Sequence, residues 1–145
     1  MTRQTRSHLE PGTAGIAAFV AMSACLFAGW ASAAAAAHGN LFKAAMRIGV
    51  PIAFGTDAGV FPHGMNAMEF GLMTDLGMSP AAALLAGTRD AAKLLGVEAD
   101  VGTLQAGKVA DIVAVPGNVL SDIHATEHPV FVMHLGRIVV QRAAT

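Results

Sequence analysis

The chain has 145 residues, with nine Lys and Arg, ten Asp and Glu, and a formal net charge of −1. This near-neutral balance does not favour nucleic acid or an anionic membrane surface as a partner. The single cysteine, Cys25, excludes an intrachain disulfide.

The first 33 residues have the pattern of a secretory signal peptide. Two arginines give a positive start, an uncharged apolar stretch spans 16–30, and Ala31-Ser32-Ala33 is typical of a signal-peptidase site. A retained membrane anchor is the alternative, because the uncharged run 11–37 is long enough to span a bilayer. We therefore expect an exported protein, periplasmic or secreted, or a membrane-anchored one if the leader stays attached.

A linker is predicted at 34–40, followed by a helix and a short strand. Apolar residues at helical spacing predict a helix from Leu41 to Gly49. The apolar run from Val50 to Phe54, bounded by turn residues, is typical of a strand buried on both faces. Asp57 follows at its carboxyl end, where barrel enzymes carry catalytic groups. The alternative is that Asp57 only caps a turn.

Three helices are predicted next. Asn66 and Glu69 approximate a capping box for a helix that ends at Gly77. Ser79, followed by Pro80, predicts the start of the second helix. The third is predicted to start at a Thr88 cap and to stop before a glycine at 96. Residues 97–145 alternate and turn like β structure, which predicts a β-strand appendage.

Four segments in this order resemble the amidohydrolase superfamily, particularly its imidazolonepropionase-like and Xaa-Pro dipeptidase-like branch. They span 50–64, 77–96, 102–115 and 131–140, so the resemblance covers roughly 41–140. It implies an α/β fold class: a C-terminal fragment of a TIM-barrel amidohydrolase. Residues 41–96 would form the last barrel strand and helices, and 97–145 part of the small β appendage. A complete barrel of this kind typically needs about 250 residues.

The resemblance also implies functional residues. The family aspartate that matches Asp57 binds the active-site metal, expected to be zinc, and moves the catalytic proton. His63 is expected in the substrate-binding loop, with an ordinary loop histidine as the alternative. The family's His-x-His pair is absent from this sequence. A catalytic zinc ion generally needs three protein ligands, so Asp57 alone cannot hold one.

Two further motifs are expected to be structural. His124 to His128 spells the His-x-x-Glu-His of some zinc proteases, but that motif works only on a helix. Pro129 follows at once, so a solvent-facing polar loop is the expectation. Asp111, in the Lys-x-x-Asp segment typical of the appendage, is likewise expected to be structural.

The expected function is that of a partial metal-dependent amidohydrolase, which hydrolyses carbon–nitrogen bonds of a small amide or dipeptide substrate. It would be inactive without the missing barrel strands, which a complementary subunit or a homo-oligomer would have to supply. An unpaired barrel strand is also prone to aggregate. The alternative is a non-catalytic remnant of a truncated or rearranged gene, with at most a scaffolding role.

Overall fold

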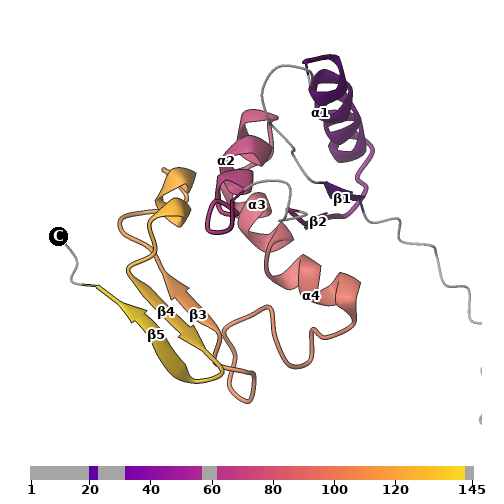
Figure 1. Cartoon of the computed structure of the whole chain (residues 1–145). Helices are drawn as coiled ribbons and strands as arrows, with labels where there is room; N and C mark the ends of the chain where they lie inside the picture. The colour runs from indigo at the N-terminus through magenta and orange to yellow at the C-terminus, as the bar shows by residue number, and fades with distance from the viewer. Residues whose placement is uncertain (1–19, 23–31, 57–61, 143–145) are drawn as a thin grey trace, which may run out of the picture.

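The computed structural model describes residues 20–22, 32–56 and 62–142. The described chain has two parts: a helical part that contains a short parallel sheet, and a C-terminal antiparallel sheet (Figure 1). We refer to the first part, up to residue 96, as the α/β part, and to 97–142 as the β appendage. This arrangement agrees with the predicted α/β class.

The α/β part begins with a strand–helix–strand unit. Strand β1 (Val20–Met22), helix α1 (Ser32–Arg47) and strand β2 (Ile52–Phe54) follow one another. The two strands pair in parallel, with Val20 opposite Ile52. A parallel pair needs a crossover connection of this kind, usually a helix.

Two expectations for the N-terminal region need correction or stay open. The predicted linker at 34–40 is wrong, because α1 starts at Ser32. The alanines at 33–37 have the highest helix propensity of all residues, which extends the helix toward the N-terminus. Most of the predicted leader lies outside the described residues, and its described part forms β1 and the start of α1. The signal peptide stays a prediction. Among the described helices, none has the length and apolar character needed to cross a bilayer.

Three short helices follow: α2 (Met68–Asp75), α3 (Pro80–Ala86) and α4 (Arg89–Leu95). The predicted start of α3 is confirmed, because the Ser79 hydroxyl accepts a hydrogen bond from the backbone N–H of Ala82. The predicted capping box of α2 is wrong, since its N-cap is Ala67 and no side chain caps it. Thr88 occupies the N-cap position of α4, as predicted, but its side chain does not cap the helix, because the hydroxyl donates to the Leu84 carbonyl oxygen.

One hydrophobic cluster holds the α/β part together. Phe42 from α1 is fully buried, and Ile52 from β2 and Met73 from α2 pack with it. Burial of such side chains is worth roughly 1.5–3 kcal/mol each relative to an exposed position. The remaining members of the cluster are Met78, Ala83 and Ala86.

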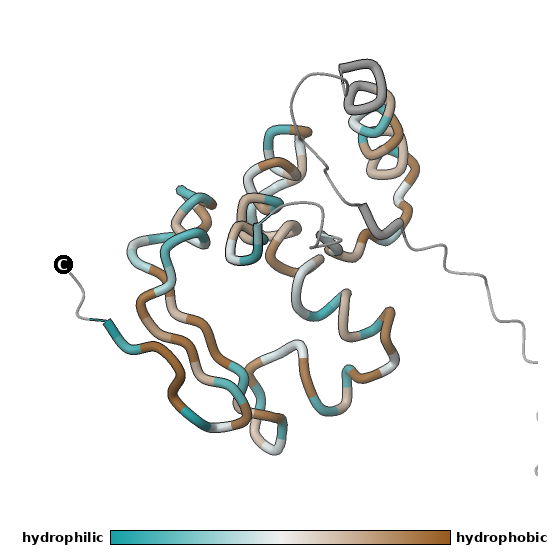
Figure 2. The backbone as a smooth tube through the Cα atoms, viewed as in Figure 1, coloured by the Kyte–Doolittle hydropathy of each residue, from teal (hydrophilic) through white to brown (hydrophobic). Residues whose placement is uncertain are grey.

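The β appendage is an antiparallel sheet in the order β3-β4-β5. Its strands are Ile112–Ala114, Phe131–His134 and Arg137–Gln141. Leu135 and Gly136 connect the last two strands with φ values of 50° and 74°, the backbone of a tight hairpin turn. These strands are largely apolar along their length (Figure 2).

The 3-10 helix η1 (Ile123–Glu127) joins the two parts, because it leads into the appendage sheet and packs on α2. Ile123 and Ala125 of η1 are buried. The expected solvent-facing loop at this point is therefore wrong. Because Gly71 on α2 has no side chain, the His124 ring approaches the helix closely; a Cβ on Gly71 would lie 2.7 Å from His124 Cε1.

Candidate functional site

The candidate site is the carboxyl end of β2. Asp57, the predicted catalytic residue and metal ligand, lies outside the described residues. The chain on either side of it is described, up to Thr56 and again from Pro62. The site can therefore be built from its flanks.

Thr56 is the last described residue before Asp57, and only 9% of it is exposed. It follows Ile52 and Ala53, which are also buried. A polar side chain buried at this depth must be hydrogen-bonded to avoid a desolvation penalty. Thr56 meets that need by accepting a hydrogen bond of 2.9 Å at Oγ1 from Nδ2 of Asn66.

Asn66 contacts the described chain on both sides of segment 57–61, at Thr56 and at Gly64. Besides its bond to Thr56, its Oδ1 accepts a hydrogen bond of 3.3 Å from the backbone N–H of Gly64. We call this pair of contacts the Asn66 bridge. It brings the end of β2 and the approach to α2 together through one side chain.

The first turn of α2 packs against the end of β2. The rings of Phe54 and Phe70 stack with centroids 4.6 Å apart and planes at 27°. Glu69, next in sequence to Phe70, is only 4% exposed although it carries a carboxylate, and it is engaged with another group of the protein. A buried carboxylate is stable only when paired or hydrogen-bonded, which agrees with the burial and the engagement of Glu69.

The sequence pattern does not reveal the Asn66 contacts or the burial of Glu69. Their spacing was interpreted as a capping box, but neither side chain caps α2. Their position soon after a strand that ends on an aspartate was the available signal, because loops at that end of a strand carry functional groups.

His63 lies on the exposed part of the loop, beside Gly64 with its φ of 97°. The structure places it two residues beyond the segment that is not described and next to the Asn66 bridge. Its assignment to substrate binding stays a prediction.

The described residues do not fit a catalytic zinc ion by themselves. Within 32–56 and 62–142, no three His, Cys, Asp or Glu side chains lie close enough to share a metal ion. The structure supplies no geometry for a reaction step at a metal.

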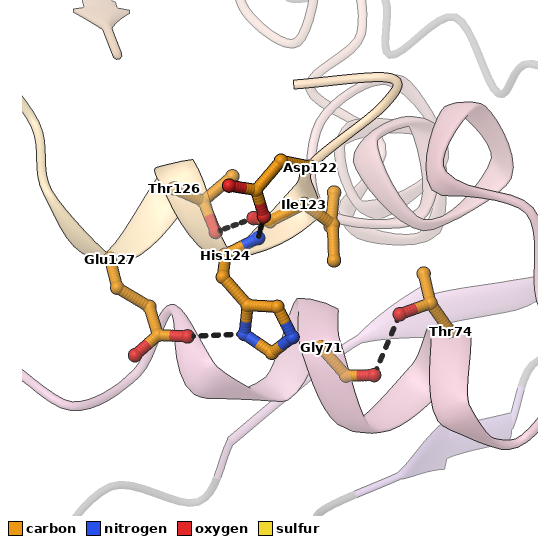
Figure 3. A network of polar contacts seen from close by, with 7 residues as sticks. All are labelled: Gly71, Thr74, Asp122, Ile123, His124, Thr126 and Glu127. Atoms are coloured by element: carbon orange, nitrogen blue, oxygen red, sulfur yellow. Dashed lines mark hydrogen bonds and ion pairs between the residues drawn. The ribbon is translucent and has the colours of Figure 1, made fainter. Parts of the chain in front are cut away.

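The His-x-x-Glu-His segment has a structural role. His124 Nδ1 lies 2.8 Å from Glu127 Oε1, and the Asp122 carboxylate accepts the backbone N–H of His124 (Figure 3). The hydrogen bond with Glu127 raises the pKa of His124, with smaller electrostatic contributions from Asp122 and from Asp75 on α2. Because the segment forms a 3-10 helix, its histidines do not adopt the α-helical arrangement of a zinc protease motif.

Asp111 is structural, as expected. Its Oδ1 accepts the backbone N–H of Leu135 at 2.7 Å and contacts the His134 ring at 3.0 Å. The Leu135 N–H, and more weakly His134, hold the pKa of Asp111 below its usual value. Asp111 thus fixes the turn between β4 and β5.

Comparison with known proteins gives a consistent result. A sequence model of the Amidohydrolase family matches residues 29–139. Ochratoxinase from Aspergillus niger is 36% identical over 110 residues, which cover 73% of this chain and 22% of that protein. Imidazolonepropionase from Aromatoleum aromaticum is 44% identical over 68 residues, covering 45% of this chain and 16% of that protein.

Solved structures agree with the sequence matches. A Xaa-Pro dipeptidase with bound methionine in its active site superposes with a TM-score of 0.69 at 41% identity. The match covers 71% of this chain and 25% of the dipeptidase. The chain thus spans about a quarter or less of the length of these relatives.

Proposed function

The chain belongs to the amidohydrolase family, and we propose that it forms part of a metal-dependent hydrolase that cleaves carbon–nitrogen bonds. The observation that carries this proposal is the family match over 29–139, which includes β2 and the residues at its carboxyl end. We assign β2 as the last strand of a TIM barrel. In that fold, the loops after the carboxyl ends of the strands build the active site.

In this proposal, Asp57 is a metal ligand and the group that accepts a proton from the attacking water and passes it to the leaving nitrogen. A carboxylate can do both in turn, because general acid–base catalysis needs only a group within hydrogen-bond reach of the reacting atoms. His63, exposed on the same loop, would contact the substrate. A small amide or dipeptide is the proposed substrate, supported by the 41% identity to a Xaa-Pro dipeptidase.

We propose that the remaining metal ligands come from a further polypeptide. The described sheet supports this proposal, because β2 pairs only with β1 within the described residues. A barrel strand pairs on both sides, so the second edge of β2 is suited to a further strand. A complementary subunit or a homo-oligomer is the proposed source. Export is proposed as well, from the leader pattern alone.

The second candidate function is a scaffolding role without catalysis. The two candidates differ in whether the protein holds a metal at Asp57 and turns over substrate.

The test uses the full chain purified under native conditions, together with any protein that co-purifies. Zinc per chain and hydrolysis of a panel of Xaa-Pro dipeptides are measured for the parent, Asp57→Asn and Asp100→Asn. Asp100 is exposed in the appendage and serves as the matched control. Metal and hydrolysis that are lost only in Asp57→Asn support the catalytic role. A folded parent without metal or hydrolysis would overturn it in favour of scaffolding.

A further inference from the structure

The side chain of Lys108 ends among three oxygen atoms of the connection between α4 and β3. Its Nζ donates to the carbonyl oxygen of Glu98 at 2.6 Å, to the hydroxyl oxygen of Thr103 at 2.7 Å and to the carbonyl oxygen of Val101 at 3.3 Å. We call these three acceptors the oxygen cradle. A lysine ammonium has three N–H donors and no acceptor, so the cradle offers one acceptor to each donor.

The composition of the cradle is suited to a cation with a single charge. Its members are two backbone carbonyls and one hydroxyl, all of them uncharged. Uncharged oxygens of this kind can replace the water around a monovalent ion, as rings of carbonyls do in potassium channels. Divalent ions are usually held with the help of carboxylates, and the cradle contains none. A primary ammonium group therefore matches both its charge and its number of acceptors.

Backbone hydrogen bonds build the cradle without help from the Lys108 side chain. The N–H groups of Asp100 and Val101 donate to the Val97 carbonyl oxygen at 3.0 Å and 3.1 Å. The Val109 N–H donates to the Asp100 carbonyl oxygen at 2.9 Å, which brings the chain next to Lys108 against this turn. The three oxygens should therefore stay close together when the lysine side chain is removed.

Gly102 fixes the turn on α4. It stands between Val101 and Thr103, two residues of the cradle, and its φ of 90° is a backbone conformation that favours glycine. A Cβ built on Gly102 would lie 2.6 Å from the Cβ of Ala92 on α4. The cradle thus has a packed support on one side.

Two simpler roles do not account for Lys108. It does not cap α4, because that helix ends at Leu95 with Gly96 as its C-cap, and both carbonyls of the cradle lie beyond it. It is also not a freely solvated surface lysine, since Lys108 is half-buried and all three of its donors have acceptors.

We infer that turn 98–103 is a binding site for a primary ammonium ion, which Lys108 occupies from within the same chain. Removal of the lysine side chain vacates this site, and a free alkylammonium ion can then take its place. The inference concerns the junction of α4 with the appendage, and it does not depend on the proposed hydrolase activity.

The test uses thermal unfolding of the full chain with propylammonium chloride as the probe. Lys108→Ala removes Cγ, Cδ, Cε and Nζ, which are the heavy atoms of propylammonium. Propyltrimethylammonium chloride at the same concentration is the control salt, because it has the same chain and charge but no N–H donor. Lys93→Ala is the control variant, since Lys93 is exposed on α4.

The unfolding midpoint of Lys108→Ala is expected to lie about 5 °C below that of the parent, because the hydrogen bonds of a charged donor are lost. Propylammonium at about 100 mM should restore about 3 °C, as a dissociation constant of about 10 mM would give. Propyltrimethylammonium should restore nothing, and Lys93→Ala should respond equally to both salts. An equal response of Lys108→Ala to both salts, or none to either, would overturn the inference.

A second measurement decides if Lys108→Ala does not fold. NMR of ¹⁵N-labelled side-chain ammonium groups compares hydrogen exchange at Lys108 and Lys93 in the parent chain. Exchange at Lys108 is expected to be about tenfold slower, the equivalent of one typical hydrogen bond, and to accelerate in Thr103→Val, which removes one acceptor. Equal exchange at the two lysines, or no acceleration in Thr103→Val, would overturn the inference.

Discussion

The α/β part and the β appendage are stabilised in different ways. Nine of the eleven buried hydrophobic residues of the described chain lie in the α/β part, and the other two, Ile123 and Ala125, belong to η1. The appendage strands contribute none, and Val113, Ile138 and Val139 are more than half exposed. Side-chain burial thus holds the α/β part, whereas the appendage sheet has little burial of its own.

Hydrogen bonds from single polar side chains fix the appendage instead. Lys108 Nζ donates to the backbone oxygen of Glu98 at 2.6 Å and to the hydroxyl of Thr103 at 2.7 Å. Asp111 fixes the β4–β5 turn through the N–H of Leu135. Substitutions in the hydrophobic core should therefore lower the stability of the α/β part most. Changes of pH, and substitutions at glycines with positive φ, should mainly affect the appendage and its contacts with the α/β part.

The largest effect is expected for Phe42→Ala in α1. Phe42 is 0% exposed, and its loss leaves a cavity in the cluster around Met73. Such a substitution lowers the free energy of unfolding by about 3–5 kcal/mol. Urea unfolding followed by circular dichroism measures it. Leu41→Ala, next in sequence but 58% exposed, is the control and should change stability by less than about 0.5 kcal/mol; equal effects would refute the assignment of the core.

A smaller effect is expected for Gly102→Ala, at the junction of the two parts. Gly102 has a φ of 90°, and a Cβ there would lie 2.6 Å from Ala92 Cβ and 3.1 Å from the Thr88 carbonyl oxygen. Strain and overlap together should cost about 2–4 kcal/mol.

Gly107→Ala is the matched control for Gly102→Ala. Gly107 has a similar φ of 88°, but nothing lies within 4 Å of its Cβ position. Only backbone strain should remain, about 1 kcal/mol. The difference between the two midpoints of thermal unfolding measures the packing of the appendage against α4, and equal midpoints would show that this packing contributes nothing.

The third effect is a loss of local stability in the appendage at low pH. The pKa of Asp111 is lowered from its usual 3.8 by the Leu135 N–H. Its contribution to stability is therefore present above pH 3.8 and is lost as the pH falls through the lower pKa of the folded state. Amide exchange at Leu135, measured between pH 2 and 5 and corrected for intrinsic rates, should accelerate on acidification. Asp111→Asn should abolish this pH dependence.

The smallest effect is expected at the contact of η1 with α2. The Glu127 carboxylate raises the pKa of His124 above its usual 6.5. The contribution of this pair is fully present below pH 6.5 and is lost as the pH rises through the raised pKa. Because 62% of the His124 side chain is exposed, solvent screens the pair and the change should be slight. Amide hydrogen exchange at Ala125, measured from pH 6 to 9, should accelerate slightly as this contribution is lost. A Glu127→Gln variant, which lacks the carboxylate, should show no such acceleration.

Local signals were sufficient for several elements. Ser79 followed by Pro80 predicted the start of α3, and Gly96, with its φ of 68°, ends α4 as expected. Each depends on the backbone preference of one or two residues, and these residues can be identified in the sequence without knowledge of the fold.

Two of the wrong predictions share a physical cause. Asn66 and Glu69 satisfy a local capping pattern, yet Asn66 bonds to Thr56 after β2 and the Glu69 side chain is buried. Similarly, η1 was expected to be a solvated loop, but it packs on α2 where Gly71 leaves room for His124. In each case a contact with a distant segment outweighed a local preference.

The sequence by itself determined the family, the α/β class and the position of Asp57 after a buried strand, because these depend on motif order and on short-range patterns. Only the tertiary structure decided what surrounds that position: the Asn66 bridge, the buried Glu69 and the docking of η1 on α2. A polar side chain goes to whichever partner satisfies its hydrogen bonds once it is buried. That partner is known only after the chain has folded.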